Sequence, residues 1–193
     1  MPKIFTQIVA RPDSSRTARR IEEQGFDGIS FVDSQNLSGD VYVAMATAAV
    51  ATETLELSTG VTNPVTRHPA VTASAIGSVQ RVAGDRVQLG IGRGDSALAH
   101  IGRSPARVID FERYLIAVQK YLKGEEVLFE DLKFGETVSR GVDELGLAAS
   151  AIASQINWLP GRLGKVDVEV AATGPKVISA AARHSDRIMF ALG

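Results

Sequence analysis

The sequence predicts an α/β protein built on a parallel sheet, and the alternation of strand-like with helix-like stretches is the main observation behind this. Six apolar stretches have the length and composition of strands, namely Ile4 to Ala10, Gly28 to Asp33, Leu55 to Thr62, Arg86 to Gly92, Val166 to Thr173 and Asp186 to Leu192. Strict alternation with helices implies parallel strands. Most of these stretches end in small or polar residues, which suits ligand binding. The pattern predicts a (β/α)₈ TIM barrel in which residues 1–193 form one domain with about six of the eight strands.

The connecting helices have their own local signals. Ser14 or Ser15 is expected to cap a helix that carries Ala18 and Ile21 on its buried side. Pro69 and Pro175 each begin a helix, because the N–H that proline lacks has no partner at a first helical position. The other helices are expected at about Tyr42 to Thr52, Ala70 to Val82, Pro105 to Leu122 and Lys176 to Arg183.

The alternation breaks between Gly124 and Lys165, where acidic residues and glycines follow no clear period. A stretch of this length indicates an excursion from the barrel, and a lid over its mouth is one interpretation. The alternative is a hairpin at Val127 to Phe134 followed by a helix at Leu145 to Leu159. Neither interpretation requires a second domain.

Composition excludes several classes of function. Hydrophobic residues make up 45% and charged residues 22% of the chain, as in ordinary globular domains. A net charge of -1 gives no reason to expect nucleic acid or a membrane surface as partner. Cysteine is absent, and the three histidines lack metal-ligand spacing, so no metal is expected. We therefore expect a cytoplasmic protein that acts on a small molecule.

Candidate site residues follow the predicted strands at their carboxyl ends, where parallel sheets bind ligands. Asp33 is a candidate to accept hydrogen bonds from a cofactor, and Asp95 is a candidate acid or base. Thr62, Arg93 and Gly94 follow other strands at the same end. The alternative for both aspartates is a loop-capping role.

The run Gly90 to Asp95 contains Gly92, Gly94 and Ala97 in the spacing of a dinucleotide-binding fingerprint. That fingerprint belongs after the first strand of a unit and needs an acidic residue at the end of the next strand. Here the run follows the fourth strand, and the next strand lies beyond Gly124. The glycines are better explained as positions where a flat ligand approaches the backbone.

The best candidate anion site is the turn formed by Ala172, Thr173, Gly174, Pro175 and Lys176. A strand ends there in small residues, and a helix begins with its positive end facing outward. The Thr173 hydroxyl and the Lys176 ammonium would complete a phosphate site. The alternative is a tight turn that needs glycine only for its shape.

Four runs of residues, in order, resemble the bacterial luciferase-like superfamily of flavin and deazaflavin oxidoreductases along nearly the whole chain. They are Ile21 to Gly28 with the strand ending at Asp33, Thr59 to Pro64 with Arg67 to Pro69, Arg86 to Asp95, and Ala172 to Lys176 with Ala181 to Arg187. Within the superfamily, the chain is most similar to the branch that uses coenzyme F420. That branch includes methylenetetrahydromethanopterin reductase and sugar-phosphate or alcohol dehydrogenases.

The resemblance implies that a hydride moves between a substrate and C5 of the deazaflavin. It also implies a non-proline cis peptide at Gly60-Val61, in a bulge behind the cofactor ring. Asp33 matches a carboxylate that contacts the deazaflavin, and Asp95 matches a Glu proposed as proton donor. Two positions depart from the pattern. Ser34 stands where several relatives have His, so a His-based mechanism does not transfer, and Arg93 replaces a small polar residue, which argues against a sugar-phosphate substrate.

Two other functions fit the same residues. One is an FMN-dependent monooxygenase, in which reduced flavin activates oxygen, and the other is a shortened, non-catalytic flavin-binding protein. Six strands would also leave the first and last as unpaired edges. We therefore expect a longer natural product, and either a homo-oligomer or a complementary carboxy-terminal fragment that covers those edges.

Overall fold

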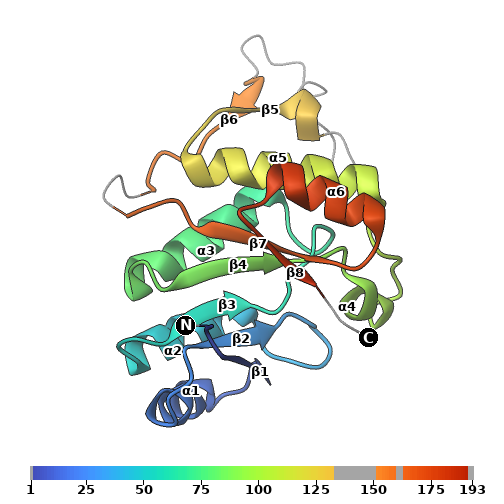
Figure 1. The fold of residues 1–193 in the computed structure, drawn as a ribbon. Helices are drawn as coiled ribbons and strands as arrows, with labels where there is room; N and C mark the ends of the chain where they lie inside the picture. The colour runs from blue at the N-terminus through green and yellow to red at the C-terminus, as the bar shows by residue number, and fades with distance from the viewer. Residues whose placement is uncertain (1, 133–150, 160–162, 191–193) are drawn as a thin grey trace.

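The computed structural model describes residues 2–132, 151–159 and 163–190. Within them, six parallel strands form one sheet in the order β1-β2-β3-β4-β7-β8. The strands are β1 (Phe5–Val9), β2 (Gly28–Val32), β3 (Glu56–Thr59), β4 (Val87–Ile91), β7 (Asp167–Ala172) and β8 (Arg187–Phe190). Each lies inside a predicted strand, and the sheet curls into part of a barrel (Figure 1). The prediction of a parallel α/β sheet is confirmed.

Helices cover the outer face of this sheet (Figure 1). They are α1 (Ser14–Glu23), α2 (Val41–Ala51), α3 (Pro69–Ala83), α5 (Val108–Lys123) and α6 (Pro175–His184), while the short α4 (Asp95–Ala99) lies at the carboxyl ends of the strands. Pro69 and Pro175 begin their helices as predicted, whereas the short α4 was not predicted. The capping prediction for α1 is wrong, because the residue before the helix is Asp13 and Ser14 lies inside it. The Ser14 hydroxyl instead accepts a hydrogen bond from the Arg11 N–H at 2.8 Å.

The two faces of the sheet differ in chemistry because side chains alternate along a strand. Ile29, Phe31 and Leu57 are completely buried against the helices. Burial of one such side chain contributes about 1.5–3 kcal/mol, so this layer dominates the stability of the sheet. The other face carries polar residues such as Ser30 and Ser58, which pair in register on neighbouring strands. This polar concave face leads to the carboxyl ends of the strands.

The described part of the 124–165 excursion differs from both local expectations. Strand β5 (Val127–Leu128) pairs antiparallel with β6 (Ala153–Ser154), and a 3-10 helix, η1 (Phe129–Leu132), follows β5. The hairpin expected at Val127 to Phe134 is therefore wrong, as is the helical end of Leu145 to Leu159 within residues 151–159. The β5–β6 pairing holds this segment instead, and the hydroxyls of Tyr121 and Ser154 lie 2.7 Å apart beside it.

The rest of that expected helix, residues 145–150, and Phe134 lie outside the described residues. Helix α5 separates the β5–β6 pair from the sheet (Figure 1). The lid role of the excursion stays a prediction.

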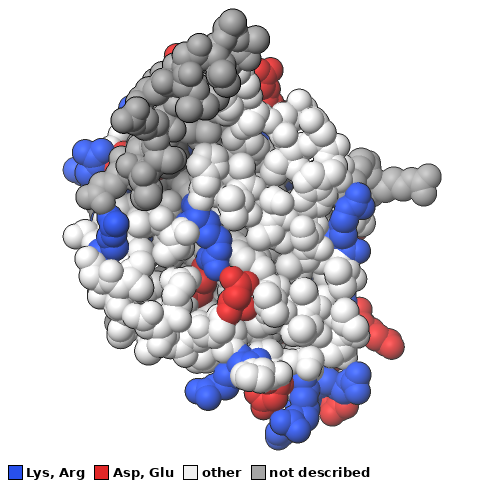
Figure 2. Space-filling model, turned by 180° about the vertical axis from the view of Figure 1, so that it is seen from behind, with Lys and Arg blue, Asp and Glu red and all other residues white. Residues whose placement is uncertain are grey.

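The face of the molecule opposite to that of Figure 1 carries few charges over most of its area (Figure 2). Basic side chains gather at its lower end, where α1 lies, and acidic side chains are interspersed with them. None of the described helices has the length and apolar character needed to cross a bilayer.

Glu22 joins the end of α1 to the chain that enters β3. Its Oε1 atom accepts hydrogen bonds from the N–H groups of Thr54 at 2.7 Å, Leu55 at 2.9 Å and Glu53 at 3.0 Å. Burial raises the pKa of this carboxyl, but the hydrogen bonds from Thr54 and Leu55 outweigh it, and the net effect is a lowered pKa. When a carboxyl has a lower pKa in the folded than in the unfolded chain, its ionisation stabilises the fold. This stability is fully present above the pKa of the unfolded chain, about 4.3, and is lost as pH falls through the pKa of the folded protein.

We expect Glu22→Gln to lower the free energy of unfolding by about 1–2 kcal/mol at pH 7, because the N–H donors lose a charged acceptor. The difference from wild type should shrink as pH falls below about 4.3, where the carboxyl of the unfolded chain becomes protonated, and should disappear as pH falls through the lower folded pKa. Urea denaturation at pH 7 and pH 3.5 measures both effects, and the exposed neighbour Glu23→Gln is the control. An equal loss at both pH values would contradict the charge-based explanation.

Candidate active site

The site is centred on an interruption of β3 near its carboxyl end. The Gly60-Val61 peptide bond is cis, which confirms the prediction at that position. The chain then rejoins β4, since the Thr62 N–H donates to Gly90 O and the Gly92 N–H donates to Thr62 O, both at 2.9 Å. The strand predicted at Leu55 to Thr62 is therefore interrupted by a bulge of two residues, Gly60 and Val61.

Close packing on the concave side explains the glycine in the bulge. A Cβ atom at position 60 would lie 2.7 Å from Ser30 Cβ and 2.8 Å from Gln7 Nε2, which are too close for any side chain. The Gln7 amide donates to the Gly60 carbonyl oxygen and holds the bulge from β1. The bulge therefore depends on residues of the first two strands.

The ends of three strands form one wall beside the bulge. A Cβ atom at Gly92 would lie 3.0 Å from Val61 Cγ2 and 3.7 Å from Ala171 Cβ. These three small or medium-sized residues come from β7 and the segments that follow β3 and β4. Because their side chains are short, they form an apolar surface with little projection at the mouth of the barrel.

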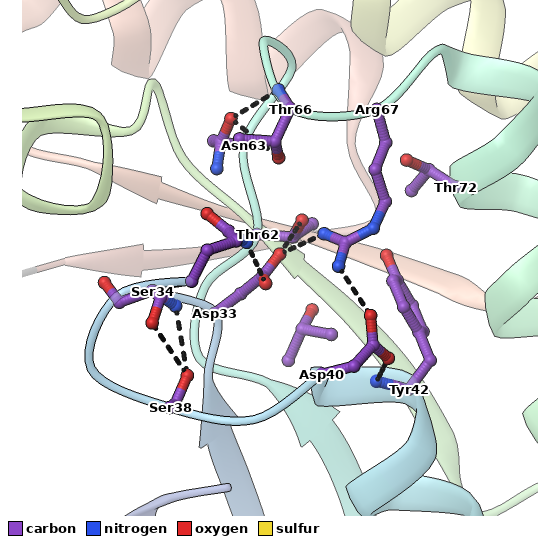
Figure 3. A network of polar contacts seen from close by, with 12 residues as sticks. Asp33, Ser34, Ser38, Asp40, Tyr42, Thr62, Asn63, Thr66, Arg67 and Thr72 are labelled. Atoms are coloured by element: carbon purple, nitrogen blue, oxygen red, sulfur yellow. Dashed lines mark hydrogen bonds and ion pairs between the residues drawn. The ribbon is translucent and has the colours of Figure 1, made fainter. Parts of the chain in front are cut away.

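Asp33 follows β2 and is almost completely buried, with 2% of its surface exposed. Its Oδ2 atom accepts hydrogen bonds from Thr62 Oγ1 and from an Arg67 guanidinium nitrogen, both at 2.6 Å (Figure 3). Its Oδ1 atom accepts a hydrogen bond from Gln35 Nε2 at 2.7 Å. The expectation of a loop-capping Asp does not describe the contacts with Thr62 and Arg67, because they join the loop after β2 to the loop after β3.

Arg67 makes a second ion pair, in which its other terminal nitrogen lies 3.0 Å from Asp40 Oδ2 (Figure 3). The guanidinium also lies over the Tyr42 ring, 5.0 Å from its centre. Burial lowers the pKa of Arg67, but Asp33 raises it more, and the net effect is a raised pKa. Burial raises the pKa of Tyr42 to about 12. At neutral pH this tyrosine is therefore neutral and the guanidinium charged.

His68 has a structural function at the start of α3. It precedes α3, and its Nδ1 atom accepts a hydrogen bond from the Ala70 N–H at 3.2 Å. Burial lowers the pKa of His68, which favours the neutral ring that this bond requires.

The β4–α4 turn lies against the segment that follows the bulge. Gly94 has φ of +90°, and a Cβ there would lie 2.8 Å from Asn63 Cβ, so both conformation and space require glycine. Arg93 donates from Nε to the Ala106 carbonyl oxygen at 2.6 Å and thereby joins the turn to the chain before α5. Asp95 is the first residue of α4 and is exposed.

The β7–α6 turn is open to solvent. Gly174 precedes α6 with φ of -103° and ψ of 153°, which any residue can adopt, and no atom of the described residues lies within 4 Å of the position of a Cβ. Thr173 and Lys176 are exposed, and Lys176 also lines the groove between α5 and α6. The geometry of the turn therefore does not require glycine at position 174. The alternative of a tight turn that needs glycine only for its shape is wrong.

Residues 9–193 match the family model described as luciferase-like monooxygenase. The chain belongs to this family. It is 32% identical over 174 residues to 5,10-methylenetetrahydromethanopterin reductase of Methanolobus tindarius, covering 89% of this chain and 48% of that protein. The reductase of the same name from Archaeoglobus fulgidus is 32% identical over 168 residues, covering 87% and 46%. The chain thus spans about half the length of these curated relatives.

Solved structures of the luciferase-like type share the fold. A coenzyme F420 dependent tetrahydromethanopterin reductase from Methanopyrus kandleri superposes with a TM-score of 0.72 at 19% identity, covering 97% of this chain and 55% of that one. An F420-dependent secondary alcohol dehydrogenase in complex with an F420-acetone adduct gives 0.74 at 20%, covering 97% and 57%. An FMN complex of a type II Baeyer-Villiger monooxygenase from Pseudomonas putida gives 0.68 at 18%, covering 97% and 56%. The prediction of a partial luciferase-like TIM barrel is confirmed.

Within this luciferase-like fold, the structure brings most of the predicted site residues together. Thr62 bonds Asp33, Val61 lies beside Gly92 and Ala171, and the turn from Ala172 to Lys176 continues from that wall. Arg93 is bonded instead to the chain before α5. Among the described residues, no group of three or more His, Asp or Glu side chains is placed to hold a metal.

Sequence analysis did not identify Arg67, Asp40, Tyr42 or Gln35 as site residues. One local signal was present for Asp40, which stands directly before an uninterrupted apolar helix. Asp40 is the N-cap of that helix, α2, and accepts a hydrogen bond from the Tyr42 N–H at 2.9 Å. No local signal shows that its second oxygen binds Arg67, because 27 positions separate the two residues.

Proposed function

We propose that this chain provides the cofactor site of an oxidoreductase that uses coenzyme F420. We further propose that the substrate is a methylene group carried by a reduced pterin, in keeping with the activity named for the two relatives of 32% identity. The observation that carries the proposal is the low wall of Val61, Gly92 and Ala171, which leads directly to an open helix N-terminus after β7.

The residues present fit a flat ring that carries a phosphate. The wall offers small apolar groups to a ring, and none of the described residues fills the space beside Gly174. The N-terminus of α6 favours a negative charge there, and the exposed Thr173 and Lys176 add a hydroxyl and an ammonium. F420, when bound, supplies hydride transfer at C5 of its deazaflavin ring.

Asp33 remains our candidate for a direct contact with the ring. An ionised carboxylate offers about four acceptor positions, and three donors among the described residues use three of them. By this count one position would remain for a donor from the cofactor, which would have to replace the present packing around the 1% exposed side chain. Thr62, which shares the Oδ2 atom with Arg67, is held in a single orientation by the same carboxylate.

The cofactor assignment is tested by titrating the chain with F420 and, separately, with FMN, and by following ligand fluorescence. We expect F420 to bind more tightly. Tighter binding of FMN would favour the monooxygenase reading of the same fold. Oxidation of reduced F420 in the presence of methylenetetrahydromethanopterin then tests the substrate, and binding without any turnover would favour a non-catalytic protein.

We expect Asp95→Asn to lower turnover by about a hundredfold or more while F420 affinity changes less than about twofold. A positioned general acid typically contributes this much to the rate, and the exposed carboxylate lies outside the buried Asp33 cluster. Steady-state kinetics and F420 titration measure the two quantities. Asp85→Asn is the control, since Asp85 is exposed and lies before β4, at the opposite end of the sheet. An equal loss of turnover and affinity would assign Asp95 to binding or structure.

A further inference from the structure

A buried ion-pair cluster joins the two loops that border the proposed cofactor site. The Asp33 side chain is 1% exposed and the Arg67 side chain 15%, so their contact at 2.6 Å is largely shielded from water. Asp33 directly follows β2, and Arg67 lies in the loop between the bulge and α3. In that setting the geometry of the pair is strongly restrained, unlike that of a surface pair.

Arg67 is itself held from several directions. Its second nitrogen bonds Asp40 Oδ2, and its guanidinium lies over the Tyr42 ring. Its backbone carbonyl oxygen accepts a hydrogen bond from the Tyr114 hydroxyl of α5 at 3.1 Å. Asp40 is fixed in turn, because its Oδ1 atom caps α2 while its Oδ2 atom binds Arg67.

The same oxygen of Asp33 receives both Arg67 and Thr62, and both distances are 2.6 Å. Any movement of the guanidinium therefore moves the carboxylate that orients Thr62, the first residue after the bulge. Figure 3 shows the Arg67 guanidinium beside this carboxylate, with its dashed contacts to Asp33 and Asp40.

We propose that Arg67 is a positioning residue of the site, which holds Asp33 and Thr62 in the orientation that the cofactor ring requires. This inference rests on the proposed function. Arg67 acts through Asp33, while the β7–α6 turn supplies the phosphate contacts independently. Loss of the Arg67 geometry should therefore reduce turnover much more than it reduces cofactor affinity.

The test uses Arg67→Lys and Arg67→Gln in the full chain, with F420 titration and steady-state kinetics under the conditions described above. One ammonium or one amide cannot bind Asp33 and Asp40 in the fixed fork that the guanidinium provides. Misplacement of a reacting group by about 1 Å costs about a hundredfold in rate, so we expect kcat to fall by about that factor in Arg67→Gln. The Kd for F420 should rise by about threefold or less, and Arg67→Lys should recover part of the rate.

Arg183→Gln is the matched control, because Arg183 makes an ion pair of similar length, 2.7 Å, with Glu112 on the outer surface. Its kcat should equal that of wild type. Circular dichroism and the folded fraction in urea identify losses that come only from unfolding, since a structural role would leave kcat per folded molecule unchanged. Unchanged kcat per folded molecule in both Arg67 variants overturns the inference. Failure of wild type to bind F420 overturns the proposed function, and the inference with it.

Discussion

Replacing Gly174 by Val is expected to weaken F420 binding by about a hundredfold and to leave the fold intact. The turn between β7 and α6 has ordinary backbone angles at this residue, and within the described ranges no atom lies within 4 Å of a Cβ position. A Cβ atom there meets no atom of the described residues, so we expect the free energy of unfolding to change by about 0.5 kcal/mol or less. It does occupy the space in front of the helix N-terminus, where the proposed phosphate approaches the backbone.

A hundredfold loss corresponds to about 2.7 kcal/mol of binding free energy, which is reasonable for a blocked phosphate contact. Fluorescence titration with F420 measures the affinity, and urea denaturation measures the stability. Gly164→Val is the matched control, because Gly164 also has open space at its Cβ position and lies before β7, at the other end of that strand. If Gly174→Val binds F420 as wild type does, the phosphate does not bind at this turn.

Arg67→Met is expected to lower the free energy of unfolding by about 3–5 kcal/mol, more than Asp33→Asn does. Removal of the guanidinium leaves the carboxylate of Asp33 charged, 1% exposed and without its ion-pair partner. Removal of the Asp33 charge leaves Arg67 still paired with Asp40 and partly exposed, so we expect a cost of about 1–3 kcal/mol.

This asymmetry is measured by urea denaturation of the two single variants and of the double variant Asp33→Asn/Arg67→Met. The double variant should be less destabilised than the sum of the singles, since it contains no unpaired buried charge. Arg183→Met, which breaks an exposed pair, should cost about 1 kcal/mol or less. Equal costs for the two single variants would mean that water reaches Asp33 and that the pair is not shielded.

The positions of the main strands and helices were predictable because their signals are local. Phe31 and Leu57 belong to short apolar runs bounded by turn residues, and Pro69 and Pro175 mark helix starts by their missing N–H groups. The β7–α6 turn was also recognised from its residues alone. Its openness was not, because only the structure shows that no other described segment fills the space beside Gly174.

The failures come from contacts between distant parts of the chain. Strand β5 pairs with Ala153–Ser154, and two-residue strands carry too little periodicity to predict such a pairing. Ser14 has the composition of an N-cap, but its hydroxyl bonds the Arg11 N–H because the chain turns one residue earlier. Local propensity is a weak preference that such contacts override.

The sequence by itself determined the alternation of strands and helices, and hence that Asp33, Thr62, Asp95 and Gly174 lie at the same end of the sheet. Parallel pairing has this consequence whatever the details of packing. Only the tertiary structure decided that Asp33 is buried and bound to Arg67, 34 positions away, while Asp95 is exposed. An ion pair of this kind depends on where two loops meet in space, and no periodicity in the chain encodes that distance.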